Sequence, residues 1–131
     1  MTTKELIANL QTVTLPWPPS ANRYWRHTVK GGRAITYLTP EGKAYKSAGY
    51  IACIRRGVRR IDGPVKITFH LYRPAKRGDI DNYTPLCQDA IRGRAYGDDD
   101  QIIEMHTYRH EDKHNPRVEV TVESATESSL F

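Results

Sequence analysis

Strict alternation of apolar and polar residues distinguishes the segment 65–72 from the rest of the chain. The apolar positions are Val65, Ile67, Phe69 and Leu71, and the positions between them hold Lys66, Thr68, His70 and Tyr72. Successive side chains of a β-strand point to opposite faces, so this pattern predicts a strand with one buried and one polar face. Pro74 marks its end.

Two helices are expected around this strand. Residues 40–56 have helix signals at both ends, with Thr39 as the N-cap and Gly57 at the stop. The residues of this first helix that are predicted to face inward are Ala44, Ala48, Ile51 and Ala52. A second helix is expected to follow a cap at Asp81 or Asn82 and to end at Gly93.

Further strands are predicted at 12–15, 101–108 and 117–123, with a loop at 110–116 between the last two. The prolines of 15–26 predict a loop there. With 131 residues, 38% of them hydrophobic, the chain has the size and composition of one globular domain spanning 1–131. Residues 1–11 are expected to form an extension of uncertain structure, and 124–131 a frayed polar tail.

No apolar run approaches the roughly 20 residues that span a bilayer, and the N-terminus lacks a signal-peptide pattern. A cytoplasmic location is therefore expected. Cys53 and Cys87 match neither a disulfide framework nor a zinc motif, and are expected to be packed, reduced thiols.

Charge is distributed unevenly along the chain. Residues 1–78 hold 15 Lys and Arg against 3 Asp and Glu, whereas residues 79–131 hold 5 against 12. A surface that attracts polyanions thus accompanies a separate concentration of carboxylates, which a nuclease needs. Basic residues are also interleaved with aromatic ones in 17–26, a composition suited to nucleic acids. The basic members of this stretch are Arg23 and Arg26, and the aromatic ones are Trp17, Tyr24 and Trp25.

The carboxylates suggest a metal centre. Asp79 and Asp81 flank a single residue, so in an extended segment both side chains point the same way. A third carboxylate from the turn 98–100 would complete an open site for Mg²⁺ or Mn²⁺. Such an ion beside DNA would promote hydrolysis of the phosphodiester backbone.

Other metal sites fit the sequence poorly. An EF-hand starting at Asp79 would need different residues at the positions occupied by Tyr83, Thr84 and Ala90. Three histidines recur every four residues, but they span a strand end and a loop and therefore do not share one helical face. They are His106, His110 and His114.

Four stretches together resemble the RusA-type crossover-junction endodeoxyribonucleases, small bacterial and phage enzymes that resolve Holliday junctions. They read LPWPPSANRYWR, LTPEGKAY, RGDIDNYTPLCQDAI and GDDDQII, in this order, and the likeness covers about residues 14–122. The resemblance implies a compact α+β domain with a small mixed β-sheet packed by two main helices. It also implies a homodimer that cuts two opposed strands of a four-way DNA junction with Mg²⁺.

The resemblance also assigns the site. The two aspartates of the family's D-x-D-N motif and the second aspartate of its D-D-x-Q motif bind the metal, and they correspond here to Asp79, Asp81 and Asp99. The family's lysine, four residues after the second aspartate, is replaced by Pro85. Substitutes for this cation could come from Lys76, Arg77 or Arg94, which with Arg23 and Arg26 are the candidate DNA-binding residues.

Three hypotheses follow. The first is a metal-dependent junction resolvase. The second is a junction-binding protein that cuts weakly or not at all, because Pro85 replaces the lysine. The third is a nuclease for branched DNA more generally. Candidate residues for opening the junction are Tyr37, Tyr96 and the loop 110–116.

Overall fold

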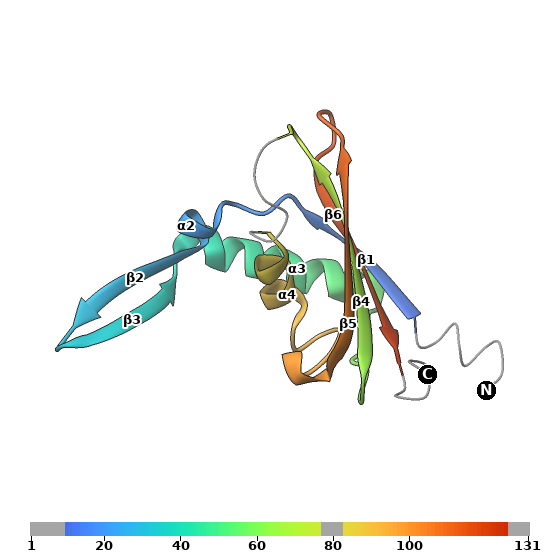
Figure 1. The fold of residues 1–131 in the computed structure, drawn as a ribbon, viewed down its shortest axis with the longest axis horizontal. Coiled ribbons are helices and arrows are strands. Elements are labelled where there is room, and N and C mark those ends of the chain that lie inside the picture. The colour runs from blue at the N-terminus through green and yellow to red at the C-terminus, as the bar shows by residue number, and fades with distance from the viewer. Residues whose placement is uncertain (1–9, 77–82, 126–131) are drawn as a thin grey trace.

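A four-stranded sheet carries helices on one face in the computed structural model of this chain, which describes residues 10–76 and 83–125 (Figure 1). The strand order is β1-β6-β4-β5. The strands are β1 (Leu10–Pro16), β4 (Val65–Arg73), β5 (Ile102–Glu111) and β6 (Arg117–Ser124). β4 runs parallel to β5 and antiparallel to β6, so the sheet is mixed and the expected α+β class is confirmed.

The alternation in β4 has the predicted effect. Val65, Ile67, Phe69 and Leu71 are fully buried, and the residues between them are only partly covered. Val118, Val120 and Val122 of β6 face the same side and complete the apolar layer on which the helices pack. The strand expected at 12–15 extends to Leu10–Pro16, and the predicted loop between β5 and β6 is confirmed at 112–116.

Helix α3 (Pro40–Arg56) begins and ends as its sequence predicts. The Thr39 hydroxyl accepts a hydrogen bond from the Gly42 amide, and Gly57 adopts a left-handed conformation at the C-terminus. The predicted inward face is wrong, because Ala44 and Ile51 are exposed. The residues that α3 buries are Gly42, Tyr45, Gly49 and Cys53.

Close packing between helices explains this rotation. A Cβ atom on Gly49 would lie 2.7 Å from Cβ of Ala90, which belongs to helix α4 (Thr84–Ile91). Glycine therefore lets the two helices approach, a property that hydrophobicity does not reveal. Helix α4 starts later than expected: its N-cap is Tyr83, and not Asp81 or Asn82, which lie outside the described residues. Leu86, Cys87 and Ala90 face the core.

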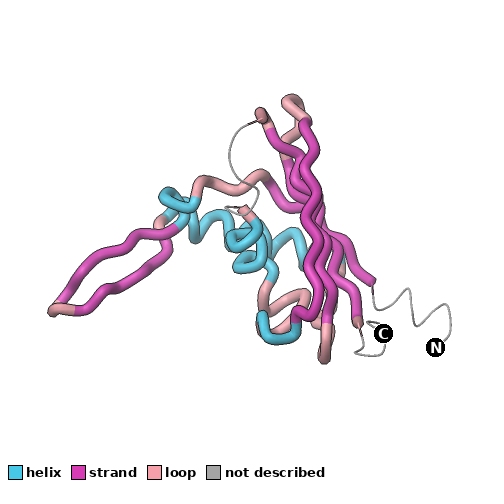
Figure 2. Tube along the Cα trace, in the orientation of Figure 1, coloured by secondary structure: helices cyan, strands magenta, loops and turns pink. Residues whose placement is uncertain are grey.

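The region 17–38 differs most from the expectation. A short helix, α2 (Ala21–Tyr24), lies within the predicted loop, after its prolines. It leads into a hairpin of β2 (Trp25–Lys30) and β3 (Arg33–Leu38) that projects away from the sheet and helices (Figures 1 and 2). Gly31 and Gly32 both have positive φ, as a two-residue hairpin turn of type I′ requires.

Both cysteines are buried free thiols, which confirms that prediction. Burial raises the pKa of the Cys87 thiol to about 12, so it stays protonated and unreactive near neutral pH. None of the described helices is both long and apolar enough to cross a membrane.

Candidate active site

The acidic turn before β5 is held in place by one glutamine. The Asp98 carboxylate accepts a hydrogen bond from the Asp100 amide and caps the short 3₁₀ helix η2 (Asp99–Gln101). Gln101 Oε1 accepts from the amides of Gly97 and Asp98, while its Nε2 donates to the carbonyls of Ile61 and Gly63. The turn is therefore fixed to the loop that precedes β4.

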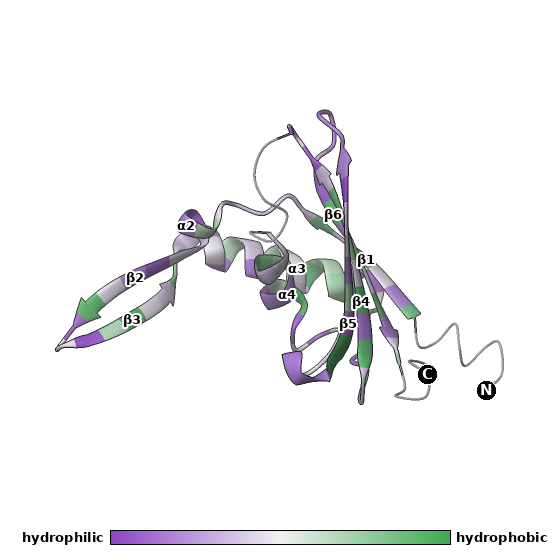
Figure 3. Ribbon diagram, in the orientation of Figure 1, coloured by the Kyte–Doolittle hydropathy of each residue, from purple (hydrophilic) through white to green (hydrophobic). Residues whose placement is uncertain are grey.

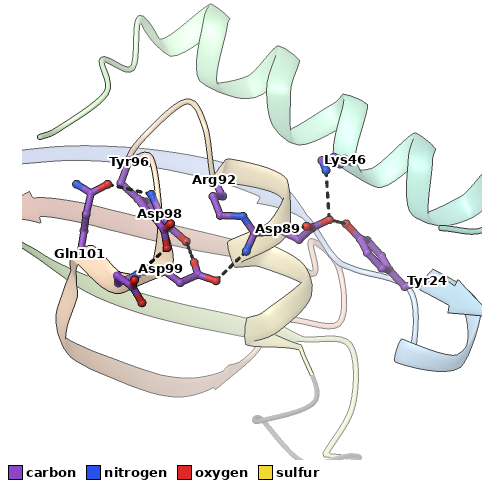
Figure 4. Close-up of polar contacts among 9 residues, drawn as sticks. Tyr24, Lys46, Asp89, Arg92, Tyr96, Asp98, Asp99 and Gln101 are labelled. Carbon is purple, nitrogen blue, oxygen red and sulfur yellow. Dashed lines mark hydrogen bonds and ion pairs between the residues drawn. The ribbon is translucent and has the colours of Figure 1, made fainter. Parts of the chain in front are cut away.

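Asp99 is the member of this turn whose side chain faces the helices (Figure 4). Its Oδ1 accepts a 2.9 Å hydrogen bond from the Tyr96 hydroxyl, and its Oδ2 accepts a 2.7 Å hydrogen bond from Nη1 of Arg92. The Asp99 side chain is 46% exposed. A carboxylate has about four lone-pair positions on its two oxygens, so these two donors orient Asp99 without exhausting its capacity for a cation.

A second aspartate, Asp89, anchors the same arginine. Nη2 of Arg92 donates a 2.6 Å hydrogen bond to Oδ1 of Asp89, whose side chain is only 9% exposed. The other oxygen accepts from the Tyr24 hydroxyl at 2.5 Å and lies 3.8 Å from Nζ of Lys46. Arg92 therefore bridges a buried carboxylate and an accessible one (Figure 4).

Both tyrosines of this network are neutral and donate hydrogen bonds to the aspartates. Burial raises the pKa of Tyr24 well above its ordinary value, and the hydrogen bond to Asp89 and the Asp89 charge add to the effect. Burial likewise raises the pKa of Tyr96, and its hydrogen bond to Asp99 raises this pKa further. For Arg92, desolvation works in the opposite direction, but Asp99 and Asp89 outweigh it and raise the pKa. Arg92 thus stays charged and both hydroxyls keep their protons.

The remaining predicted site residues fall in different places. Asp79, Asp81 and Arg77 lie outside the described residues. Arg23 pairs with Glu41 at 2.9 Å, so part of its charge is neutralised. The Arg94 guanidinium lies over the Tyr50 ring, 3.9 Å from the centroid, and faces α3.

Arg26 and Lys76 are exposed. The described residues flanking 77–82 are Lys76, which follows the end of β4, and Tyr83, which precedes α4. Asp99 contacts Arg92 at the opposite end of α4. Helix α4, which separates Tyr83 from Arg92, has 8 residues. Its length is therefore about 12 Å at 1.5 Å per residue.

The chemistry of the turn fits a hard divalent cation. Asp99 is accessible and oriented, and carboxylate oxygens are the ligands that Mg²⁺ prefers. Within residues 10–76 and 83–125, no group of three His, Cys, Asp or Glu side chains forms a metal site. The assignment of Asp79, Asp81 and Asp99 to one metal centre therefore stays a prediction.

Sequence reasoning missed the residues that support Asp99. Asp89 and Arg92 are three apart on α4, a spacing that favours an ion pair and could have been recognised. No sequence signal connects Tyr24 to them, because that contact depends on tertiary packing. Tyr96 was a candidate for opening the junction, but it is fully buried and cannot enter DNA.

Comparison with known proteins gives one consistent result. The family profile described as "Endodeoxyribonuclease RusA" matches residues 16–123. The "Crossover junction endodeoxyribonuclease rusA" of Enterobacteria phage 82 is 34% identical over 119 residues, which cover 87% of this chain and 94% of the phage protein. Proteins named "Crossover junction endodeoxyribonuclease RusA" from Escherichia coli K12 and Shigella sonnei are 33% and 32% identical, with the same coverage of each chain.

Proposed function

This chain belongs to the RusA family of endodeoxyribonucleases, and from this we propose that it resolves Holliday junctions by paired hydrolytic nicks in opposed DNA strands. Its relatives are named for cutting crossover junctions, and the match extends through the acidic turn to β6. The observation that carries the proposal is the oriented, accessible Asp99 carboxylate at the position of the family's D-D-x-Q motif. The assignment extends to the whole of 1–131 as one nuclease domain, in which Leu10 and Gln11 of the expected extension 1–11 belong to β1 and Ser124 of the expected tail 124–131 belongs to β6.

Asp79, Asp81 and Asp99 are proposed to hold Mg²⁺, with Mn²⁺ as a substitute. When bound, the ion would polarise the scissile phosphate and lower the pKa of a water ligand. The protein's own contribution is orientation. Arg92 and Tyr96 hold the Asp99 carboxylate in one direction, so that it does not have to reorganise when it meets a cation.

The missing lysine bears on the cutting activity. Pro85 occupies the first turn of α4, and proline supplies no positive charge. Arg92 is the described cation next to Asp99, whereas Arg94 is directed to Tyr50. Neither arginine therefore takes the place of the lysine, because both terminal nitrogens of Arg92 are bonded to carboxylates at the end of α4 opposite Pro85. The chain remains a nuclease in this proposal.

A homodimer is the proposed active form. A four-way junction has two-fold symmetry and two opposed cleavage points, which a two-fold symmetric dimer matches. Among the described strands, β5 lies at an edge of the sheet and pairs with β4 alone, so it is one place where a second copy could add to the sheet.

A synthetic four-way junction labelled on each strand tests the proposed function. The wild-type protein should nick two opposed strands at symmetric positions with Mg²⁺ and should produce no nick in EDTA. Asp81→Asn should abolish nicking while binding survives. A fork and a plain duplex of matched sequence should be cut far more slowly.

Other results would reject the proposal. Tight junction binding without product at any metal concentration would favour the binding protein suggested by Pro85. Equal rates on junction, fork and duplex would favour a broader branched-DNA nuclease. Full nicking by Asp81→Asn would remove that residue from the site.

A further inference from the structure

The β2–β3 hairpin is the most exposed part of the described chain. Residues 26–37 are all exposed, and only Trp25 and Leu38 at its root pack against the core. Each strand has six residues, which gives the hairpin a length of about 20 Å at 3.3 Å per residue. It extends away from the sheet and helices (Figure 1). Within the described part of the protein, the surface of residues 26–37 is therefore not covered by packing against the core.

The two faces of the hairpin differ in charge. Directly paired residues of an antiparallel hairpin share a face, and faces alternate along each strand. One face, here called the basic face, combines cations with apolar and aromatic side chains, and its residues are Arg26, Thr28, Lys30, Arg33, Ile35 and Tyr37. The opposite face has no Lys or Arg between its root and its tip, and its outer residues are His27, Val29, Ala34 and Thr36.

The cations of the basic face are available to a ligand. None of the ion pairs formed within residues 10–76 and 83–125 involves Arg26, Lys30 or Arg33. The hairpin, residues 25–38, also contains no Asp or Glu. Hydrophilic and hydrophobic positions lie side by side along both strands (Figure 3). Such a surface is complementary to a polyanion, and the exposed Tyr37 ring adds an apolar contact.

The root of the hairpin is attached to the candidate active site. Tyr24, the residue before β2, donates to Asp89, and Arg92 joins Asp89 to Asp99. The three hydrogen bonds measure 2.5, 2.6 and 2.7 Å. The root of the hairpin is thus fixed relative to Asp99.

We propose that the β2–β3 hairpin is a DNA-binding arm whose basic face contacts the phosphates of one junction arm. This inference rests on the proposed function and extends it to a specific surface. A two-stranded β-ribbon fits the major groove of B-DNA, which is about 12 Å wide. The main contribution of the arm is electrostatic, through release of the counterions that phosphates hold.

A second copy of the chain is the competing occupant. The arm's exposed Val29, Ile35 and Tyr37 would suit a protein contact. Two such arms meeting across a two-fold axis would, however, bring together six uncompensated Lys and Arg side chains, three from each copy. Charge therefore favours DNA, and the test includes the oligomeric state.

Two triple variants with the same number of changes on opposite faces provide the test. One carries Arg26→Gln, Lys30→Gln and Arg33→Gln on the basic face. The other carries His27→Gln, Val29→Gln and Ala34→Gln on the opposite face. Affinity for a fluorescent four-way junction is measured by anisotropy in EDTA over a range of KCl concentrations, so that cleavage does not interfere. Light scattering after gel filtration gives the oligomeric state.

The basic-face triple should weaken binding by about tenfold or more and reduce the slope of log K against log salt by about 0.9 for each phosphate that is no longer neutralised. The opposite-face triple should bind as the wild type does. A third variant, Arg26→Lys with Arg33→Lys, should keep the wild-type slope, because phosphate neutralisation needs only the charge. All variants should have the oligomeric state of the wild type.

Each other outcome overturns the inference in an identifiable way. Unchanged affinity and slope in the basic-face triple would mean that the arm does not touch DNA. Equal reductions of affinity in the two triples would reject the assignment to one face, and a change of oligomeric state confined to the basic-face triple would assign the arm to self-association. Failure of the wild-type protein to bind the junction would instead reject the proposed function.

Discussion

Arg92 donates a 2.7 Å hydrogen bond to Oδ2 of Asp99, and its other terminal nitrogen reaches the buried Asp89. Arginine presents its donors in a rigid planar fork, so one side chain can hold two carboxylates in a fixed relation. The orientation of the Asp99 carboxylate, on a surface turn, therefore depends on the buried Asp89 through Arg92. The contributions of Asp99 and Arg92 to cutting can therefore be measured separately.

Asp99→Asn should abolish junction cutting. The amide keeps the shape of the side chain but loses the charge that a divalent cation requires. We expect a fall of more than about 100-fold, because removing a residue that only supports a metal ligand already costs up to about that factor. Asp100→Asn is the matched control, because within the described residues the Asp100 carboxylate makes no hydrogen bond or ion pair. Product formation in single-turnover assays measures the cutting rate of both variants. If Asp99→Asn cut the junction and Asp100→Asn did not, Asp100 and not Asp99 would be assigned to the metal site.

Arg92→Ala should lower cutting by about 10- to 100-fold, the range seen when the supporting partner of a metal ligand is removed. It should also reduce the free energy of unfolding by about 1–3 kcal/mol, because Asp89 loses a charge-assisted hydrogen bond. Arg94→Ala, two residues away, removes an arginine that contacts Tyr50 on α3 and should leave cutting near the wild-type rate.

The metal dependence of cutting separates orientation from folding. If Arg92 orients Asp99, Arg92→Ala should need more Mg²⁺ for half-maximal rate, and direct Mn²⁺ binding should weaken in parallel. A variant that loses stability but keeps the wild-type rate and metal dependence would show that Arg92 has a purely structural role.

The four strands of the main sheet and α3 could be predicted from the sequence because local rules decide them. Alternation determined β4, and Thr39 with Gly57 determined the ends of α3. The hairpin was missed although Gly31 and Gly32, between two β-prone segments, are a recognised turn signal. The buried side of α3 was mistaken because Gly42 and Gly49 are buried by close approach and not by hydrophobicity.

In the candidate site, too, one residue could be predicted from the sequence and the residues that support it could not. Asp99 was predicted because clustered carboxylates and a family motif both point to it. The bridge from Asp99 through Arg92 and Asp89 to Tyr24 joins a turn, a helix and the root of a hairpin, and no local pattern encodes such a contact. Asp79 and Asp81 remain predictions, since they lie outside the described residues.

Alkaline pH should destabilise the protein through Tyr24. Its pKa is raised in the folded state by burial and by Asp89, so the unfolded chain loses this proton first as pH rises. The stability from this group is full below about pH 10, the pKa of an unperturbed tyrosine, and is lost above it. Tyr24→Phe should lower the free energy of unfolding at neutral pH by about 1–3 kcal/mol. It should also make the fall above about pH 10 less steep, by about 1.4 kcal/mol per pH unit.

Urea denaturation at a series of pH values measures both effects of Tyr24→Phe. Tyr37→Phe, at an exposed position on the arm, is the control and should leave the free energy of unfolding at neutral pH unchanged. An unchanged alkaline slope in Tyr24→Phe would mean that this hydroxyl does not contribute to the pH dependence of stability.

Gly49→Ala should destabilise the protein even though alanine favours helix. The added Cβ would lie 2.7 Å from Cβ of Ala90 and 3.0 Å from its carbonyl oxygen, so α3 and α4 have to separate. Forcing an extra carbon into a packed contact costs about 1–3 kcal/mol, whereas the helix propensity of alanine returns at most about 1 kcal/mol. Ser47→Ala, at an exposed position on the same helix, should be neutral or slightly stabilising.

The double variant Gly49→Ala with Ala90→Gly identifies the contact responsible. It removes the Cβ–Cβ overlap but keeps the approach to the carbonyl oxygen, so it should recover part of the stability. Ala90 follows Asp89 on α4, and Lys46 of α3 faces that carboxylate, so separating the helices would also shift the support of Arg92. Junction cutting by Gly49→Ala should therefore fall and should recover with the double variant. Full cutting by a destabilised Gly49→Ala protein would show that the spacing of α3 and α4 does not control the position of Asp99.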